Sequence, residues 1–164
     1  MTAQHRIAKR ADLPEIVAIY NATIPGRMVT ADTEPVSVES REKWFSEHRP
    51  DSRPLWVCEQ QQRITAWLSF SSFYGRPAYS RTTEIGLYVH PDYRRAGLGR
   101  YLLDTAIKHA PVIGVDTLLG FIFGHNEPSL RLFEDCGFQR WGHLPRVATL
   151  DGIERDLLIL GRRT

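Results

Sequence analysis

Cysteine is scarce in this chain of 164 residues. The sequence contains only Cys58 and Cys136, and no Cys-x-x-Cys pair, which argues against the usual zinc and thiol-redox motifs. Each cysteine falls within an apolar or helical pattern. We therefore expect two small buried side chains in a reducing compartment rather than a disulfide. The His, Asp and Glu residues show no paired spacing typical of a metal site either, so no metal is predicted.

Long hydrophobic runs and a strong net charge are also missing. No apolar segment approaches the roughly 20 residues needed to span a bilayer. Residues 1–6 lack the hydrophobic stretch of a signal peptide and are not followed by one, so we expect a soluble cytoplasmic protein without membrane contact. The 21 Lys and Arg against 19 Asp and Glu leave a charge of +2. The arginines are spread along the chain, and no nucleic-acid partner is predicted.

What is present is an ordinary globular composition, with 42% hydrophobic and 24% charged residues. This composition excludes collagen-like, low-complexity and wholly disordered chains. The length suits one domain, and we find no internal repeat and no linker, so residues 1–164 are interpreted as a single domain.

Hydrophobic periodicity and turn residues predict an alternation of strands and helices. Strands are expected at 7–9, 55–59, 64–70, 83–90, 118–123, 138–142 and 155–160, and helices at 13–20, 38–45, 98–109 and 126–136. The segment 21–38 has no steady period and contains Pro25, Gly26 and Pro35, which indicates a long functional loop. This order predicts an α/β (α+β) fold, with a mixed central sheet flanked by helices.

A glycine-containing segment, Arg-Arg-Ala-Gly-Leu-Gly-Arg at 94–100, lies between an alternating strand and an amphipathic helix. Glycines there let the backbone approach a ligand, and the first amides of the helix can point at an anion. The segment is neither a Walker loop nor a dinucleotide-binding Gly-x-Gly-x-x-Gly. It predicts a phosphate site, although a merely tight strand-to-helix turn would have the same spacing.

Two motifs carry a resemblance to a known family. Arg94-x-x-Gly97-x-Gly99 after the strand at 84–89 is similar to the acyl-CoA-binding motif of the GNAT superfamily of N-acetyltransferases. The segment 126–138 resembles the Asn-x-x-Ser…Gly-Phe segment of the same superfamily. The likeness extends over nearly the whole chain and narrows to the branch of phosphinothricin and methionine sulfoximine acetyltransferases. It implies the GNAT fold, with splayed strands in the mixed sheet.

The resemblance also implies acetyl-CoA as the acetyl donor. Its pantetheine arm would pair with the strand at 87–89, and its pyrophosphate would lie on the amides of the following loop. Asn126 would bond the arm near the thioester, with help from Ser129; as an alternative, Asn126 is only a helix N-cap. The expected donor-binding residues are Leu87, Tyr88, Val89, Arg94, Arg95, Ala96, Gly97, Leu98, Gly99, Arg100, Asn126 and Ser129.

The acceptor implied by the branch is the amine of a small amino acid or amino-acid analogue. An ammonium has no free electron pair, so transfer requires a route for its proton. Glu84 aligns with the glutamate of Thr-x-Glu in the branch and is the expected general base; otherwise it is an exposed carboxylate or a partner of Arg81. Arg76 and Arg81 are expected to bind the acceptor's carboxylate or phosphinate, although solvated loop arginines are common.

One departure from the family pattern, two weaker site candidates and two alternative functions remain. Phe133 stands where many superfamily members have a tyrosine that protonates the departing thiolate, so CoA leaves as thiolate or takes its proton from water. His125 and His143 are weaker candidates for carrying protons. Alternative functions are acetylation of a peptide or protein amino terminus, and a noncatalytic CoA-sensing module. Relatives in the branch tend to form homodimers, so we expect a homodimer.

Overall fold

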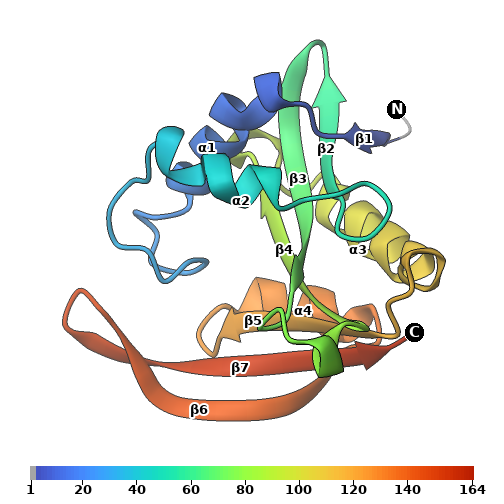
Figure 1. Cartoon of the computed structure of the whole chain (residues 1–164). Coiled ribbons are helices and arrows are strands. Elements are labelled where there is room, and N and C mark those ends of the chain that lie inside the picture. Colours follow the sequence, from blue (N-terminus) through green and yellow to red (C-terminus); the bar gives the residue numbers. More distant parts are fainter. Residues whose placement is uncertain (1–2) are drawn as a thin grey trace.

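One mixed sheet of seven strands, in the order β1-β2-β3-β4-β5-β7-β6, organises the computed structural model, which describes residues 3–164. The strands are β1 (His5–Ile7), β2 (Leu55–Gln60), β3 (Arg63–Ser72), β4 (Thr82–Val89), β5 (Thr117–Phe123), β6 (Gln139–Leu150) and β7 (Ile153–Arg163). The α-helices are α1 (Leu13–Ala22), α2 (Glu42–Ser46), α3 (Leu98–His109) and α4 (Glu127–Asp135). The predicted helix-flanked mixed sheet is confirmed (Figure 1).

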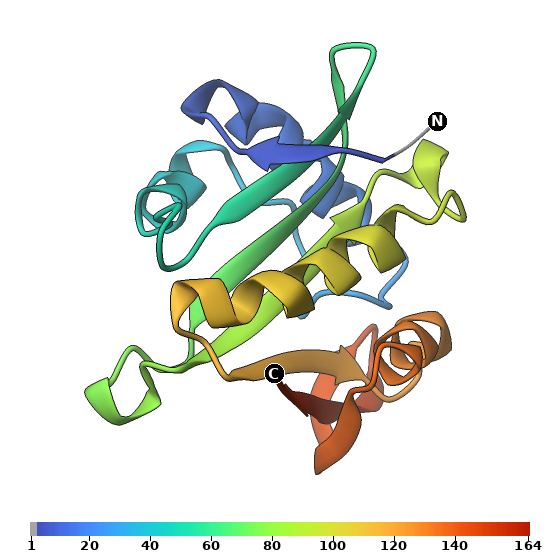
Figure 2. The same ribbon diagram turned by 90° about the vertical axis from the view of Figure 1, so that its right-hand side faces the viewer.

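Helices cover both faces of the sheet. A larger buried cluster joins β2–β5 to α3 and α4 and includes Leu102 and Phe133, and a second one on the other face includes Ile16 of α1. Successive residues of β2 divide between them, since Trp56 belongs to the first cluster and Val57 to the second, as the twofold period of a strand requires. Figure 2 shows α3 lying across its face of the sheet.

The neighbouring strands β4 and β5 separate after a short paired stretch. They pair in parallel at residues 82–84 of β4, and Glu84 opposite Leu119 is the last pair. Beyond it, β4 stays paired with β3 as far as Val89, and β5 stays paired with β7 as far as Phe123. The edges of β4 and β5 that face each other are therefore free of strand pairing beyond Glu84, which is the splay that the resemblance implies.

The last two strands are much longer than the sequence predicts. Expected at 138–142 and 155–160, they run over Gln139–Leu150 and Ile153–Arg163 and are joined at Asp151 and Gly152, both with positive φ. Most of β6 is exposed, so no apolar alternation marks its length, and its pairing shifts register between Leu144 and Ala148. Periodicity alone could not detect a strand whose pairing comes from its neighbour.

Smaller boundary differences lie near the start of the chain. The first strand begins at His5 rather than at residue 7. The helix expected at 38–45 divides into a 3₁₀ turn, η2 (Glu39–Arg41), followed by the short α2. Cys58 and Cys136 are buried and unpaired, as expected. Within residues 3–164, no helix combines the length and apolar character needed to cross a membrane.

The loop at 23–38 is fastened to distant parts of the fold. His125 Nε2, just after β5, donates to the carbonyl of Arg27 at 2.7 Å. The Arg27 guanidinium reaches Asp151 at the tip of the β6–β7 hairpin, with Nε 3.1 Å from Oδ2. These two ties hold the loop beside the hollow between β4 and β5, which Val29 of the loop lines.

Candidate active site

The segment at 94–100 presents backbone amides that no protein acceptor uses. Arg95 and Gly97 adopt positive φ, at 62° and 81°, and α3 begins at Leu98. Among the described residues, no acceptor receives a hydrogen bond from the amides of residues 94–100. The segment is exposed apart from Leu98 and Gly99. Free amides at a helix start, with a positive end of the helix dipole behind them, suit an anion such as phosphate.

Glycine is needed at positions 97 and 99 of this loop for different structural reasons. A β-carbon on Gly97 would meet no atom within 4 Å, so the residue is required by its positive φ. A β-carbon on Gly99 would lie 3.3 Å from Cδ2 of Leu132, so Gly99 allows α3 to pack closely against α4. Of the two, only Gly97 therefore has open space where a β-carbon would lie.

A groove of about 650 Å³, here called the loop groove, extends from this loop along β4 to the start of α4. It contains all of the expected donor-binding residues except Ala96: Leu87, Tyr88, Val89, Arg94, Arg95, Gly97, Leu98, Gly99, Arg100, Asn126 and Ser129. Sequence reasoning missed its opposite wall, which includes Met28 and Val29. Both belong to the segment 21–38, for which the sequence predicts a functional loop without indicating individual residues.

Asn126 is buried at the start of α4, and the two polar atoms of its side chain differ in their contacts. Its Oδ1 accepts from the Ser129 amide at 3.3 Å, which makes it the N-cap. No described residue accepts a hydrogen bond from its Nδ2, and the residue lines the loop groove. The cap uses only Oδ1, so the side-chain Nδ2 of Asn126 is available to donate to a ligand.

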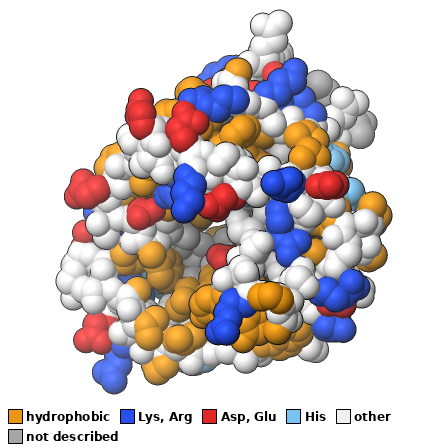
Figure 3. All heavy atoms as spheres, viewed as in Figure 1, with side chains coloured by type: hydrophobic (Ala, Val, Ile, Leu, Met, Phe, Trp, Pro, Cys, Tyr) orange, Lys and Arg blue, Asp and Glu red, His pale blue; other side chains and the backbone are white. Residues whose placement is uncertain are grey.

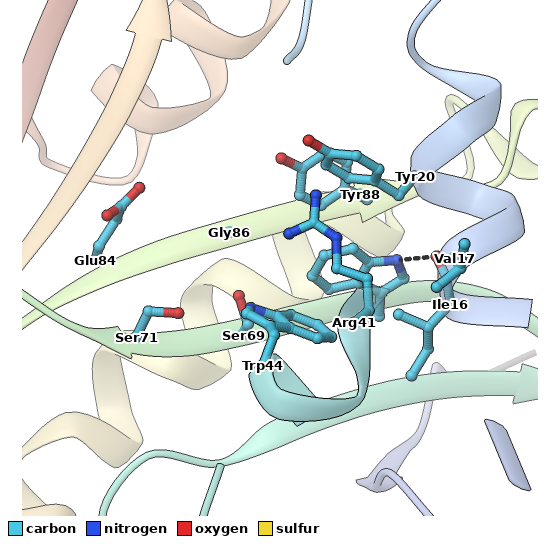
Figure 4. Close-up of a pocket in the computed structure, with 11 residues that line it drawn as sticks. Ile16, Val17, Tyr20, Arg41, Trp44, Ser69, Ser71, Glu84, Gly86 and Tyr88 are labelled. Carbon is cyan, nitrogen blue, oxygen red and sulfur yellow. Dashed lines mark hydrogen bonds between the residues drawn. The ribbon is translucent and has the colours of Figure 1, made fainter. Parts of the chain in front are cut away.

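A second hollow of about 290 Å³, the aromatic cavity, lies between the sheet and the helices α1 and α2. It is lined by Ile16, Val17, Tyr20, Arg41, Trp44, Trp67, Ser69, Ser71, Glu84, Gly86 and Tyr88. Figure 4 shows Arg41 from η2 and Glu84 from β4 projecting into it from different elements. Figure 3 shows the hollowed face, with acidic side chains in and near the depression.

Glu84 lies where the strands part. The residue lines the aromatic cavity and also a smaller hollow of about 80 Å³ between β4 and β5, the fork cavity, which it shares with Asn126 and Phe133. Burial raises the pKa of the Glu84 carboxyl above its ordinary value, and no described residue hydrogen-bonds to it. A carboxylate so placed is accessible to ligands and readily takes up a proton.

Tyr88 is the one described residue that lines all three hollows. Its ring stacks on Trp67 at a centroid distance of 4.4 Å and lies 5.2 Å from the ring of Tyr20. Burial raises the pKa of the Tyr88 phenol, so it stays neutral. The loop groove, the fork cavity and the aromatic cavity therefore meet around this residue.

The two arginines that the sequence predicts to bind the acceptor do not line the aromatic cavity. Arg81 is 64% exposed and pairs with Asp116, with Nε 2.7 Å from Oδ2. Arg76 is exposed and precedes the 3₁₀ turn η3 (Pro77–Tyr79). Neither lines the aromatic cavity, whose arginine is Arg41. Sequence reasoning missed Arg41 because it lies in a charged stretch with no motif.

The weaker histidine candidates have other contacts. His125 is tied to the Arg27 carbonyl. His143 pairs with Asp156, with Nε2 2.7 Å from Oδ2, on the outer hairpin. Neither lines one of the three hollows, and no group of three or more potential metal ligands occurs within residues 3–164.

Comparison with known proteins identifies the family. Residues 15–138 match the model of the Acetyltransferase (GNAT) family. The chain is 53% identical over 158 residues to the Bacillus subtilis protein named "Putative phosphinothricin acetyltransferase YwnH", with 96% of each chain covered. It is 30% identical to the Escherichia coli L-amino acid N-acyltransferase MnaT, covering 94% of this chain and 90% of that one.

A solved structure shows the same fold with the donor present. The GNAT superfamily phosphinothricin acetyltransferase of Sinorhizobium meliloti, in complex with acetyl-CoA, is 26% identical and superposes with a TM-score of 0.93. The match covers 99% of this chain and 89% of that one. With its splayed strands and its family match, this chain belongs to the acetyltransferase (GNAT) family.

Proposed function

We propose that this enzyme transfers the acetyl group of acetyl-CoA to the amine of a small amino acid or amino-acid analogue, of the phosphinothricin or methionine sulfoximine kind, with Glu84 as general base. The position of Glu84 carries the proposal. It is the last paired residue before the splay and lines both the fork cavity and the aromatic cavity. A base at that point contacts the space of the donor and the space of the acceptor together.

On the donor side, the free main-chain edge of β4 after Glu84 suits an extended, amide-bearing arm. The amides of residues 94–100 would hold the pyrophosphate, with charge-assisted bonds from Arg94, Arg95 and Arg100. Asn126 and Ser129, at the inner end of the loop groove, would orient the arm near the thioester. This assignment places the reacting carbonyl near Tyr88, where the hollows meet.

On the acceptor side, Glu84 would remove the ammonium proton directly or through one water molecule. Its raised pKa makes it a stronger base than an exposed carboxylate. The neutral amine then attacks the thioester, and a backbone amide near Tyr88 or Val89 would stabilise the oxyanion. Because Phe133 has no proton to give, CoA leaves as a thiolate or takes its proton from water; a thiol pKa near ~8.5 allows this.

The size of the aromatic cavity favours a small acceptor. Its volume of about 290 Å³ is just below the roughly 300–1,000 Å³ typical of small-molecule sites. Its aromatic and serine walls suit one amino acid better than a peptide, which requires an open groove. Acetylation of a peptide amino terminus is therefore the second candidate.

A thiol-release assay with purified enzyme and a panel of amino acids, amino-acid analogues and amino-terminal peptides tests this function. We expect turnover with at least one free amino acid or analogue and little with peptides. Tight acetyl-CoA binding without turnover on any amine would instead support a CoA-sensing module. A homodimer and a cytoplasmic location also remain predictions, which sedimentation and cell fractionation address.

A further inference from the structure

The acceptor proposed above carries an anionic group, and the aromatic cavity contains one cationic side chain to receive it. Among the described residues that line this cavity, the single Arg or Lys is Arg41. Arg81 is held by Asp116 outside the cavity, and Arg76 is exposed before η3. In this chain the cation of the cavity therefore comes from the η2 turn rather than from the segment before β4.

Arg41 is held in place on one side of its guanidinium. Its Nη2 lies 3.1 Å from Oδ2 of Asp32, and its Cζ lies 4.9 Å from the centroid of the Tyr20 ring. Tyr20 in turn donates its hydroxyl hydrogen bond to Asp32. The side chain is 29% exposed. These contacts restrict its rotamers before any ligand arrives, which lowers the entropy cost of binding.

The other side of the guanidinium is free. No described residue accepts a hydrogen bond from Nε or Nη1 of Arg41. A guanidinium presents its N–H groups as a planar fork that matches a carboxylate, and Asp32 occupies only one of these donors. Figure 4 shows the Arg41 head directed into the cavity beside Tyr88.

We propose that Arg41 binds the carboxylate of the acceptor and thereby makes the enzyme select amino acids over amines that lack an acidic group. The inference rests on the proposed function, since it concerns the acceptor of that reaction. The ammonium would face Glu84, while Trp44 and Trp67 contact the apolar part of the acceptor. Arg41 is then a specificity residue that acts on binding, whereas Glu84 acts on the proton.

The test measures binding as well as turnover, so that the two proposals can fail separately. Enzyme saturated with CoA is titrated by calorimetry with one amino acid and with its carboxamide, in which the carboxylate is neutral. The amino acid is the one with the highest turnover in the panel, or L-methionine if none reacts. The variants are Arg41→Gln, Arg41→Lys, Arg76→Gln and Arg81→Gln, each checked for acetyl-CoA affinity and unfolding midpoint.

We expect Arg41→Gln to weaken amino-acid binding about 100-fold, since a charge-assisted pair contributes about 2–3 kcal/mol and each 1.4 kcal/mol is tenfold. Carboxamide binding should change less than about threefold, and Arg41→Lys should recover part of the selectivity. The Arg76 and Arg81 variants should keep the wild-type ratio of amino acid to carboxamide affinity.

Two results would overturn the role of Arg41: equal losses for amino acid and carboxamide in Arg41→Gln, or loss of selectivity in Arg76→Gln or Arg81→Gln. Absence of any amino-acid binding by the wild type would also overturn it. A preference for the amino acid over its carboxamide that depends on Arg41, without any turnover, would refute the proposed catalytic function. The role of Arg41 in binding would then still be supported.

Discussion

Gly120 on β5 makes room for the ring of Phe133 on α4: a β-carbon at Gly120 would lie 2.7 Å from Cε2 of Phe133. Phe133 is buried and lines both the loop groove and the fork cavity. The missing side chain at position 120 thus fixes where α4 rests on the sheet, and with it the wall that Phe133 gives to these two hollows.

Gly120→Ala is expected to lower the free energy of unfolding by about 1–3 kcal/mol, the usual cost of overpacking a core. Urea denaturation measures the change. The double variant Gly120→Ala/Phe133→Leu should recover part of the lost stability, because leucine lacks the ring atoms that the new methyl group would overlap. A single variant as stable as wild type would contradict the close packing.

Glu84→Gln is expected to lower kcat by about 10²–10⁴-fold if Glu84 removes the ammonium proton. Acetyl-CoA affinity should stay near that of wild type, because the carboxyl does not line the loop groove. Glu47→Gln, an exposed change just after α2, is the matched control and should leave the rate unaltered. Wild-type turnover of Glu84→Gln across the pH range would show that Glu84 is not the general base.

The same substitution should reveal a pH-dependent cost of burying Glu84. Burial raises the pKa of this carboxyl in the folded protein, so the folded state retains a proton that the unfolded chain has already released. The unfolding free energy of wild type therefore falls as pH rises from the ordinary carboxyl pKa through the raised one. Glutamine has no charge to bury. The stability of Glu84→Gln relative to wild type should increase over that window in urea titrations, and a constant difference would contradict it.

Gly97→Ala separates backbone strain from ligand contact when it is paired with Gly152→Ala. The two glycines have φ of 81° and 79°, and a β-carbon on either meets no atom within 4 Å. Each alanine should cost about 1–2 kcal/mol of stability, the penalty of a left-handed residue. Calorimetry with acetyl-CoA should show weaker binding only for Gly97→Ala, since Gly152 lies at the hairpin tip. Equal acetyl-CoA affinities of the Gly97→Ala and Gly152→Ala variants would indicate that the loop does not hold the donor.

Asn126 variants distinguish its capping role from its ligand role. Asn126→Asp retains a side-chain oxygen for the Ser129 amide and should keep the stability of wild type. It loses the Nδ2 donor, so acetyl-CoA should bind at least about tenfold more weakly if that group contacts the arm. Asn126→Ala should lose both properties, with about 1 kcal/mol of stability. Wild-type acetyl-CoA affinity in Asn126→Asp would show that Asn126 acts only as the N-cap of α4.

Much of the fold could be predicted because its signals are local. The alternation at 83–90 assigns Glu84 and Tyr88 to one face of β4, and both line the aromatic cavity. Gly97 requires a backbone shape that few other residues adopt, so the loop it belongs to is visible in the sequence. Such features depend only on neighbours a few positions away.

What could not be predicted depends on distant partners. Arg41 looks like any solvated helix arginine until Asp32 and Tyr20 are placed beside it. The long β6 has an exposed face and no apolar period, so its extent comes from pairing with β7. The ties of Arg27 to His125 and Asp151 likewise join residues about a hundred positions apart.

The meeting of three separately lined hollows at Tyr88 has a kinetic consequence. The loop groove and the aromatic cavity share no other lining residue, so a donor in the first and an acceptor in the second, as proposed, would not overlap. Donor and acceptor would then be bound at the same time, and the acetyl group would pass directly between them. No covalent acetyl-enzyme intermediate would be needed. Double-reciprocal plots at varied donor and acceptor concentrations should intersect rather than run parallel.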